Sequence, residues 1–517
     1  MSTISEQKYD SDIEKGAPAT AGSTSVSPVA NGGVDTEHGI LGQMWKVVLW
    51  ADAFGVEARG IERVPEDERH HAGLFDSGFL WFSANMTVAT LSLGTLGSSI
   101  WEMGLTDSLL TIIFFNLLTT LPVALFATWG MQTGLRQMVI GRYSFGTVGV
   151  YFPVVLNCIA CLGWAVINTI VGASALRAVP GAHQIPEAAG IIVIALITLA
   201  VALFGYKIVH KFERWAGLPV FIILIILLGQ AAPHMVSSIS LPGTATAASV
   251  LSFGGTVCGF ALGWVSYAAD YTVNLPADGS VLKVFLSTYI GLNIPLIFVE
   301  CIGAGLMSTF QNKTTWEEAY NLNGIGGLIS GPLSAMGGFG SFLLVVLALS
   351  ICANNVPNMY SFSLSFQVFG SYAQAVPRMF LVILGTIIYI VLSLVGYSHF
   401  EAWLETLLTV LSYWLAIYCV ILLEEHYLFR GGRFSNYNLV GYNNPAVLPK
   451  GYAALLASGC GIAGAVLGMS QTWYVGKIGL LVGPPPYGGD IGFELSGSFA
   501  AVTYPLFRYL EKQYYKR

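Results

Sequence analysis

Charged residues are scarce in this sequence. Asp, Glu, Lys and Arg make up 10% of its 517 residues, whereas a soluble domain has about 25%. Hydrophobic residues make up 54%, and apolar runs long enough to cross a hydrocarbon core as helices, roughly 20 residues each, recur along the chain. The alternation of apolar and polar residues that is typical of an outer-membrane barrel is missing. The composition predicts a polytopic helical membrane protein.

Other motifs that the sequence lacks exclude several kinds of segment, site and activity. The opening residues lack a basic stretch followed by an apolar one, so they do not predict a signal peptide. Cys158 and Cys161 form a CxxC without a second pair, which favours small packing residues over a metal or redox site. HExxH, GxSxG and deep paired acids are missing, which argues against an intramembrane enzyme. We expect no cofactor, no bound metal and no nucleic-acid partner.

The apolar runs predict about twelve membrane spans. These spans lie at approximately 78–101, 107–128, 147–177, 187–206, 215–231, 250–270, 282–308, 337–368, 377–397, 399–423, 450–470 and 489–509. They divide the chain into an N-terminal tail at 1–77 (disordered in its first part), a five-helix repeat at 78–231, a second repeat at 250–423, a loop at 424–449, two further helices at 450–509 and a tail at 510–517.

Basic residues predict the orientation, because cytoplasmic loops carry an excess of Lys and Arg. If the N-terminus is cytoplasmic, the outside loops hold only Arg177, Lys313 and Lys477. The inside loops then hold the others, namely Arg136, Arg142, Lys207, Lys211, Arg214, Lys283, Arg378, Arg430, Arg433 and Lys450. Both termini are therefore expected in the cytoplasm.

Two glycine-rich segments suggest an internal duplication. "LSLGTLGSS" lies in the first span and "LSFGGTVCGFALGW" lies five spans later, so the second copy would be inverted in the membrane. We expect the helices to be interrupted there, so that free backbone groups line a cavity. The alternative is that these glycines allow close helix packing. The residues concerned are Gly94, Gly97, Gly254, Gly255 and Gly259.

The stretch "LSICANNVPNMYSF" concentrates amides inside an apolar span. An amide without a partner in hydrocarbon costs several kcal/mol, yet Asn354, Asn355 and Asn358 occur together with Pro357. A single Asn would be explained by contact between helices, whereas three with a proline favour a binding site. A carboxamide offers one acceptor and two donors in a plane, which suits a flat ligand with ring nitrogens and amino or oxo groups.

A flat ligand should be held between aromatic rings. The tripeptide "LGW" occurs twice and places Trp164 and Trp264 well inside their spans. Asn168 follows Trp164 by four residues, so both lie on one helix face. Tryptophans within a span can also be ordinary packing residues. The glycine before each ring and the neighbouring amide favour a binding site.

Several segments resemble the fungal purine-cytosine permeases of the nucleobase–cation symporter-1 family. They include "LGWAVIN", "GFALGWVSYAADYTVN", "SICANNVPNMYSFSLSFQ", "EARGIERVPEDER" and "GLRQMVIGRYSFG", and the similarity runs from about residue 45 to 510. The resemblance implies an all-α, LeuT-like core of five plus five inverted helices with two further C-terminal helices. It also implies alternating access and proton-driven uptake of cytosine, adenine, guanine and hypoxanthine across the plasma membrane.

The resemblance also implies a substrate site. It carries the family's binding residues onto Trp164, Asn168, Trp264, Asn354, Asn355, Pro357 and Asn358. From the first span we expect Thr90 and Ser92 to contribute beside unwound backbone. Rival cargoes within the family are other flat amides, such as uracil, allantoin or a hydantoin. A nucleobase receptor that does not transport is a further alternative.

The coupling ion is expected to be a proton. Sodium-coupled relatives resemble one another in a pair of hydroxyls before the eighth-span amide, and here only Ser350 is present. The plainest titratable group within a span is Glu300, and an intramembrane acid is a functional hypothesis by default. A structural hydrogen bond is its alternative role. Acids at span ends are expected to face water, namely Glu401, Glu405, Glu424 and Glu425.

Overall fold

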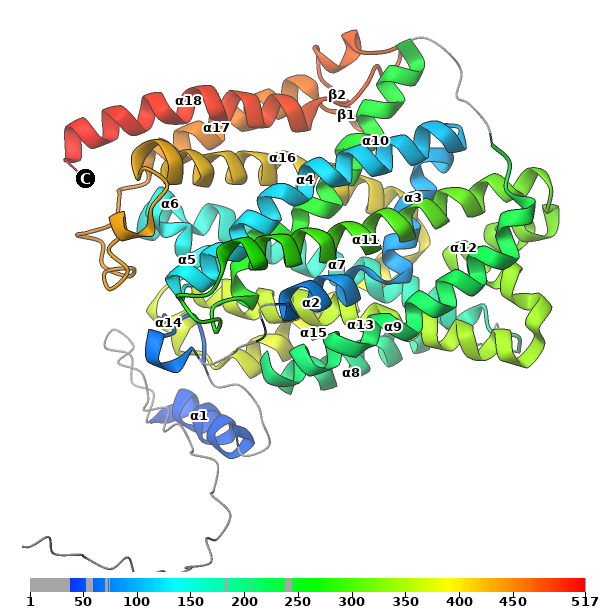
Figure 1. The fold of residues 1–517 in the computed structure, drawn as a ribbon, viewed down its shortest axis with the longest axis horizontal. Coiled ribbons are helices and arrows are strands. Elements are labelled where there is room, and N and C mark those ends of the chain that lie inside the picture. The colour runs from blue at the N-terminus through cyan, green and yellow to red at the C-terminus, as the bar shows by residue number, and fades with distance from the viewer. Residues whose placement is uncertain are drawn as a thin grey trace, which may run out of the picture.

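The structure is a computed structural model that describes residues 38–52, 59–69, 73, 75–181, 185–204, 206–237 and 244–516. Long helices run side by side and form one bundle (Figure 1). The helices are α1 (Gly39–Asp52), α2 (Asp76–Asn85), α3 (Val88–Ser99), α4 (Leu105–Thr133), α5 (Gln137–Ile140), α6 (Arg142–Gly149), α7 (Tyr151–Arg177), α8 (Glu187–Phe204), α9 (Tyr206–Ala231), α10 (Thr244–Leu262), α11 (Val281–Ser308), α12 (Thr314–Leu333), α13 (Gly337–Gln367), α14 (Ser371–Ala375), α15 (Arg378–Gly396), α16 (Phe400–Glu424), α17 (Tyr452–Gly468) and α18 (Gly492–Tyr515).

Most of these helices could cross a bilayer. Among the described residues, eight helical stretches are long and apolar enough, and the bent pair α2 and α3 would make a ninth. The helices α8 and α17 are apolar but shorter. In α4, for example, Asp107 in the first turn is the one charged side chain in 29 residues, and an acid is favourable at that helix end. The number of membrane spans expected from the sequence, twelve, stays a prediction.

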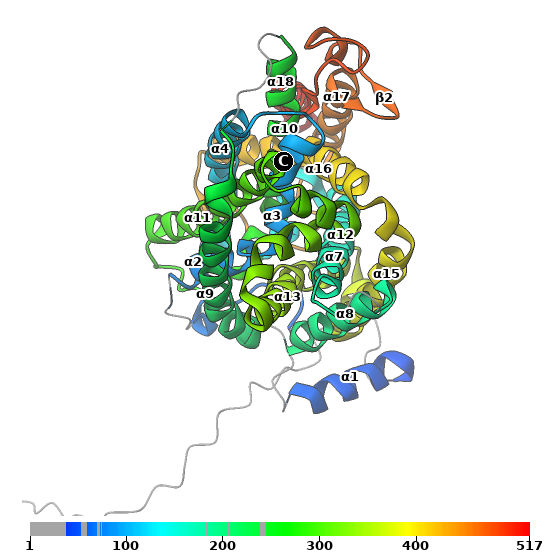
Figure 2. The same ribbon diagram turned by 90° about the vertical axis from the view of Figure 1, so that its right-hand side faces the viewer.

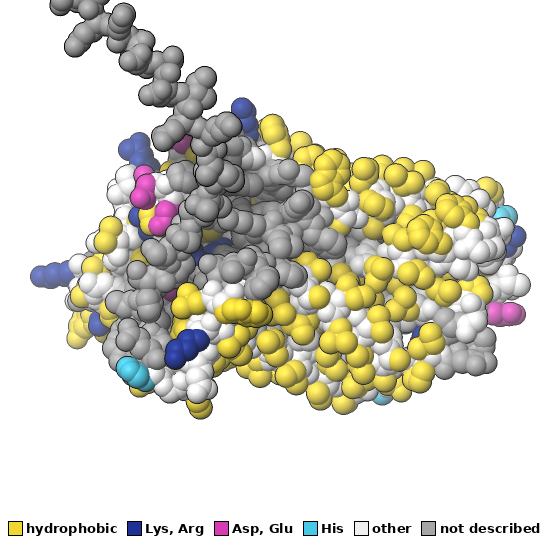
Figure 3. Space-filling model, turned by 90° about the horizontal axis from the view of Figure 1, so that it is seen from below, with side chains coloured by type: hydrophobic (Ala, Val, Ile, Leu, Met, Phe, Trp, Pro, Cys, Tyr) yellow, Lys and Arg dark blue, Asp and Glu magenta, His cyan; other side chains and the backbone are white. Residues whose placement is uncertain are grey.

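The surface has the distribution expected of a protein in lipid. On the face in Figure 3, hydrophobic side chains cover a broad band, and the charged side chains in view lie mainly near the two ends of the molecule. Exposed apolar residues occur on several outer helices, including Phe114, Leu118, Val391, Val395 and Leu456. In a bilayer these side chains would contact acyl chains rather than water.

The C-terminal helices lie outside the main bundle. Figure 2 shows α17 and α18 at its edge, where they pack on each other and on α16. They are joined by a short antiparallel hairpin of β1 (Ser470–Gln471) and β2 (Tyr474–Val475). In Figure 1, α1 lies towards the same end of the bundle as the C-terminus, and Trp45 on α1 donates a hydrogen bond to the carbonyl of Ala375 on α14.

The predicted glycine breaks are wrong in position. Gly94 and Gly97 lie inside α3, and Gly254, Gly255 and Gly259 lie inside α10. A Cβ at Gly94 would lie 1.9 Å from the carbonyl oxygen of Glu300, and a Cβ at Gly259 would lie 2.0 Å from that of Leu408. At these two positions, the absence of a side chain lets neighbouring helices approach closely, which is the alternative role.

Two helices are interrupted at other residues. The first break separates α2 from α3 at Met86 and Thr87, where the chain bends by 56° and Thr87 is extended. The second follows Leu262, where α10 gives way to short 3₁₀ turns at Gly263–Ser266 and Ala268–Tyr271. Both breaks lie against α13 or its neighbours, so polar backbone groups are available inside the bundle.

Candidate functional site

A small cavity lies beside the second helix break. We call it the central cavity, and its walls are Trp164, Phe260, Gly263, Trp264, Tyr267, Asn354 and Asn358. Its volume is about 10 Å³, about the space that one water molecule needs. The structure therefore shows this site in a closed state, with its walls in contact with one another.

Aromatic rings form most of the walls. The Trp164 ring packs edge-on against Phe260, with centroids 4.9 Å apart. The Trp264 ring packs in the same way against Trp81 at 5.1 Å and Tyr267 at 5.5 Å. Edge-to-face packing leaves ring faces available to a planar ligand. The structure thus brings both predicted tryptophans to one cavity.

Four amides make a hydrogen-bonded group that we call the amide cluster: Asn168, Asn354, Asn355 and Asn358. The Nδ2 of Asn168 donates to the Oδ1 atoms of Asn354 and Asn355, at 2.8 Å each. Asn358 Nδ2 donates to the backbone carbonyl of Asn354 at 3.0 Å. All four side chains are buried. The cluster joins α7 to α13, and Asn354 and Asn358 present it to the cavity.

The amide cluster also contacts both interrupted helices. Asn354 Nδ2 donates to the carbonyl of Ala84, in the last turn of α2, at 2.7 Å. The Tyr267 hydroxyl donates to Asn358 Oδ1 at 2.7 Å, and the Tyr271 hydroxyl donates to the carbonyl of Pro357 at 3.1 Å. The helix α13 continues through Pro357 without a break. A movement of either broken helix would therefore disturb hydrogen bonds at the cavity.

Sequence reasoning missed a second tryptophan–amide pair, Trp81 and Asn85. The Nε1 of Trp264 donates to Asn85 Oδ1 at 3.0 Å, so Asn85 fixes the orientation of a cavity wall. The spacing of Trp81 and Asn85 is the same as that of Trp164 and Asn168, four residues along a helix. A search for this repeated spacing would have found the pair.

The two hydroxyls proposed from the first span do not line the central cavity. Thr90 lies 3.4 Å from the hydroxyl of Thr87, and Ser92 donates to the carbonyl of Ala89 at 2.7 Å. Both are fully buried in α3. The residues of the first span that reach the site come from the end of α2 instead.

Glu300 is buried away from the cavity, between α11 and α4. Its Oε2 accepts a hydrogen bond from Asn116 Nδ2 at 2.7 Å. Its Oε1 has no hydrogen-bond partner among the described residues. The backbone of Glu300 also contacts Gly94 on α3. A change in the charge of this carboxyl would therefore alter the packing of α3, the helix that follows the first break.

Beyond the cavity, towards the end that holds the C-terminus, a polar link joins α5 to the second break. Asp270 Oδ1 accepts from the backbone N–H of Gln137 at 2.8 Å, and Arg136 donates to the carbonyl of Asp270 at 2.6 Å. These side chains are buried. The link therefore holds the second break against the start of α5.

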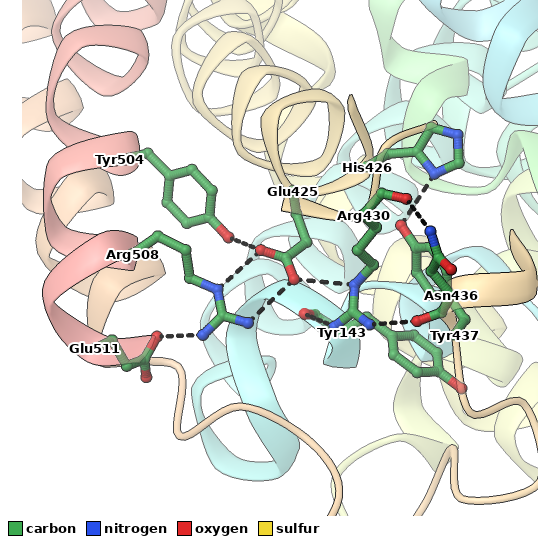
Figure 4. A network of polar contacts seen from close by, with 9 residues as sticks. All are labelled: Tyr143, Glu425, His426, Arg430, Asn436, Tyr437, Tyr504, Arg508 and Glu511. Carbon is green, nitrogen blue, oxygen red and sulfur yellow. Dashed lines mark hydrogen bonds and ion pairs between the residues drawn. The ribbon is translucent and has the colours of Figure 1, made fainter. Parts of the chain in front are cut away.

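A second polar group lies near the C-terminal end of the chain (Figure 4). We call it the charged cluster; it consists of Glu425, Arg430, Arg508 and Glu511. Glu425 accepts from Arg508 Nε at 2.9 Å and from Arg430 Nε at 3.0 Å, and Arg508 pairs with Glu511 at 3.1 Å. Glu425 is 1% exposed, so the prediction that it faces water is wrong. Its partners hold α18 against the end of α16.

Broken apolar helices around an enclosed polar and aromatic cavity define a membrane transporter of the inverted-repeat type. Among solved structures, the fold is similar to Mhp1, a nucleobase-cation-symport-1 family transporter, in a closed conformation with bromovinylhydantoin bound. The TM-score is 0.64 at 17% identity, covering 89% of this chain and 95% of Mhp1. The predicted LeuT-like, all-α fold class is confirmed.

Sequence comparison gives the family. Residues 63–476 match the model of permeases for cytosine/purines, uracil, thiamine and allantoin, and the chain belongs to this family. It is 44% identical to the purine-cytosine permease fcyB of Emericella nidulans, over 98% of this chain and 99% of that one. It is 38% identical to the purine-cytosine permease FCY2 of Saccharomyces cerevisiae, over 90% and 88%. The predicted family is confirmed.

Proposed function

We propose that this permease imports cytosine and purines, namely adenine, guanine and hypoxanthine, together with protons. The observation that carries the proposal is the amide cluster, which places Asn354 and Asn358 on a cavity between Trp164 and Trp264. The relatives named above, called purine-cytosine permeases, support the choice of cargo.

In the proposed complex, the nucleobase ring stacks on Trp164 and Trp264. The carboxamides of Asn354 and Asn358 pair with its ring nitrogens and exocyclic groups, as Asn pairs with the edge of adenine. Asn168 holds Asn354 in orientation by donating to its Oδ1, and it donates equally to Asn355 behind it. Pro357 contributes through the neighbouring backbone. Thr90 and Ser92 would need a rearrangement of α3 to contribute.

The cavity must widen to admit a base. Movement of α2 would release the bond from Asn354 to Ala84, and movement of the 3₁₀ turns would release those from Tyr267 and Tyr271. A bound nucleobase can replace these lost bonds with its own donors and acceptors. Substrate binding is thereby coupled to the opening and closing of the two breaks.

We assign the proton to Glu300. Its carboxyl is buried, and its Oε1 has no partner among the described residues, so the neutral form is the less costly one inside the bilayer. Contact with Gly94 connects Glu300 to α3. Gain and loss of the proton would then bias the position of α3.

The proposed location is the plasma membrane, with both termini in the cytoplasm. Basic residues in the loops support this orientation. In this orientation α12 and the C-terminal end of α7 face the outside of the cell. The Asp270 link and the charged cluster face the cytoplasm.

Uptake of labelled cytosine tests the proposal, in cells that lack their own nucleobase transport. Saturable accumulation should fall as external pH rises, and excess adenine should block it while excess uracil does not. Block by uracil or allantoin would favour the rival cargoes of the family. Binding without accumulation would favour a receptor. Absence of uptake by protein shown to be at the surface would contradict the cytosine assignment.

A further inference from the structure

A second cavity, larger than the central one, lies at the opposite end of the bundle from the C-terminus. We call it the outer pocket. Its volume is about 160 Å³, against about 10 Å³ for the central cavity. It is formed by the C-terminal end of α7, the start of α8, the middle of α12 and the turn before α16. The outer pocket thus has far more free space than the central cavity.

An ion pair with unused hydrogen-bonding atoms lines the outer pocket. Arg177 on α7 pairs through Nη1 with Oε1 of Glu187 on α8. The Nε of Arg177 and the Oε2 of Glu187 are buried and have no hydrogen-bond partner among the described residues. Buried polar atoms without partners are costly. The two side chains are 24% and 31% exposed and line the pocket, so a rotation of either would turn its unpartnered atom towards a ligand there.

The other walls of the outer pocket are mainly apolar. Tyr397 and Phe400 contribute aromatic rings, and Ile170 and Ile191 contribute aliphatic side chains. The paired charges of Arg177 and Glu187 compensate each other, so the pocket suits a neutral ligand rather than an ion. Guanidinium groups pair with ring nitrogen and oxo acceptors, and carboxylates accept from exocyclic amino groups. A neutral planar heterocycle with a donor and an acceptor fits these walls.

The outer pocket contacts the same helix that carries the central site. Ser174 lies six residues after Asn168 on α7, and its hydroxyl donates to the carbonyl of Asn323 at 2.5 Å. It also accepts from the N–H of Gly326 at 3.0 Å. At Asn323 and Gly324 the backbone of α12 is not helical. A ligand in the pocket would therefore touch both α7 and the bend of α12.

We propose that the outer pocket is a second binding site for the transported nucleobase, which Arg177 and Glu187 hold by its polar edge. This inference rests on the proposed function. The base would occupy the outer pocket while the central cavity is closed, and it would raise the concentration of substrate beside α7. Once the central cavity has also opened and filled, one chain holds two nucleobase molecules.

The test is the number of labelled adenine molecules bound per chain by the purified protein in lipid nanodiscs. The double variant Arg177→Ala with Glu187→Ala removes the polar edge of the pocket. The variant Leu322→Trp obstructs the rim without altering a charge, since Leu322 is 79% exposed. Glu317→Gln, at an exposed acid on α12, is the matched control.

We expect two molecules per chain for the natural protein and the control. One molecule is expected for the double variant, for Leu322→Trp and for Asn354→Ala, which impairs the central site. A single molecule bound by the natural protein, with unchanged affinity in the double variant and in Leu322→Trp, would overturn the second site and leave the proposed function standing. Absence of saturable binding of any of the four proposed bases would overturn both.

Discussion

The amide cluster and the charged cluster offset the free-energy cost of burying polar groups in different ways. The amide cluster contains no charge, and its members touch a cavity and two broken helices. The charged cluster pairs two acids with two arginines, and its members join α18 to the end of α16. Neutral amides can exchange partners at modest cost, whereas breaking a buried ion pair leaves an uncompensated charge. The first arrangement suits binding and release, and the second suits a fixed junction.

The largest effect is expected from Arg508→Ala in the charged cluster. It leaves Glu425 buried with one cation fewer, and loss of one partner of a buried pair costs about 3–5 kcal/mol. The amount of folded protein, measured by fluorescence-detected size exclusion, should fall sharply. Protein that does fold should keep the natural KM for cytosine. Arg433→Ala, at an exposed arginine three residues after Arg430, is the control.

If Arg508→Ala instead changed KM while the folded amount stayed normal, the charged cluster would be part of the transport cycle and the contrast between the two clusters would fail.

The next effect is expected from Asn354→Ala in the amide cluster. This change removes a cavity wall and leaves Asn168 and the carbonyl of Ala84 with fewer partners, at about 1–3 kcal/mol for each unsatisfied group. Cytosine uptake should fall by about a hundredfold, with protein still at the surface. Asn293→Ala removes a buried amide on α11 and should leave KM unchanged. Equal loss in both variants would mean that Asn354 acts through stability alone.

A smaller effect is expected from Trp264→Ala. Loss of one stacking face costs about 1–3 kcal/mol, so the KM for cytosine should rise about ten- to a hundredfold. Trp264→Phe should recover part of the loss, because it keeps a ring but not the bond to Asn85. Trp473→Ala, at an exposed tryptophan, is the control. An unchanged KM for Trp264→Ala would remove this residue from the site.

The smallest effect on binding is expected from Glu300→Gln. The amide can still accept from Asn116, so the affinity for cytosine should change less than twofold. Gln cannot carry a proton, so accumulation should cease to depend on external pH, and uptake should only equalise cytosine across the membrane. The measurement is the ratio of internal to external label at pH 5 and pH 8. If accumulation of cytosine still depended on external pH in Glu300→Gln, Glu300 would have a structural role only.

Much of the site could be predicted because polar residues are conspicuous in apolar helices. Trp164, Asn168, Trp264 and the amides around Asn354 lie within hydrophobic runs, and the structure brings them together. Asn85 was missed because it lies in a span whose break occurs one residue later, at Met86 and Thr87, with no glycine or proline to mark it.

Other features depend on contacts between distant parts of the chain. Glycine permits both an unwound helix and close packing, and the sequence does not separate the two, so the breaks were predicted at the wrong residues. Glu425 was expected in water because it ends an apolar run. Its burial depends on Arg508, which lies 83 residues later. The outer pocket likewise forms only where α7, α8 and α12 pack together in the folded chain.

The most direct test of the central claim is a structure determined with cytosine bound. We expect the cytosine ring between Trp164 and Trp264, with its polar edge within hydrogen-bonding distance of Asn354 and Asn358, and a central cavity wider than the present one. A cytosine bound only at residues other than these would contradict the assignment of the central cavity as the substrate site.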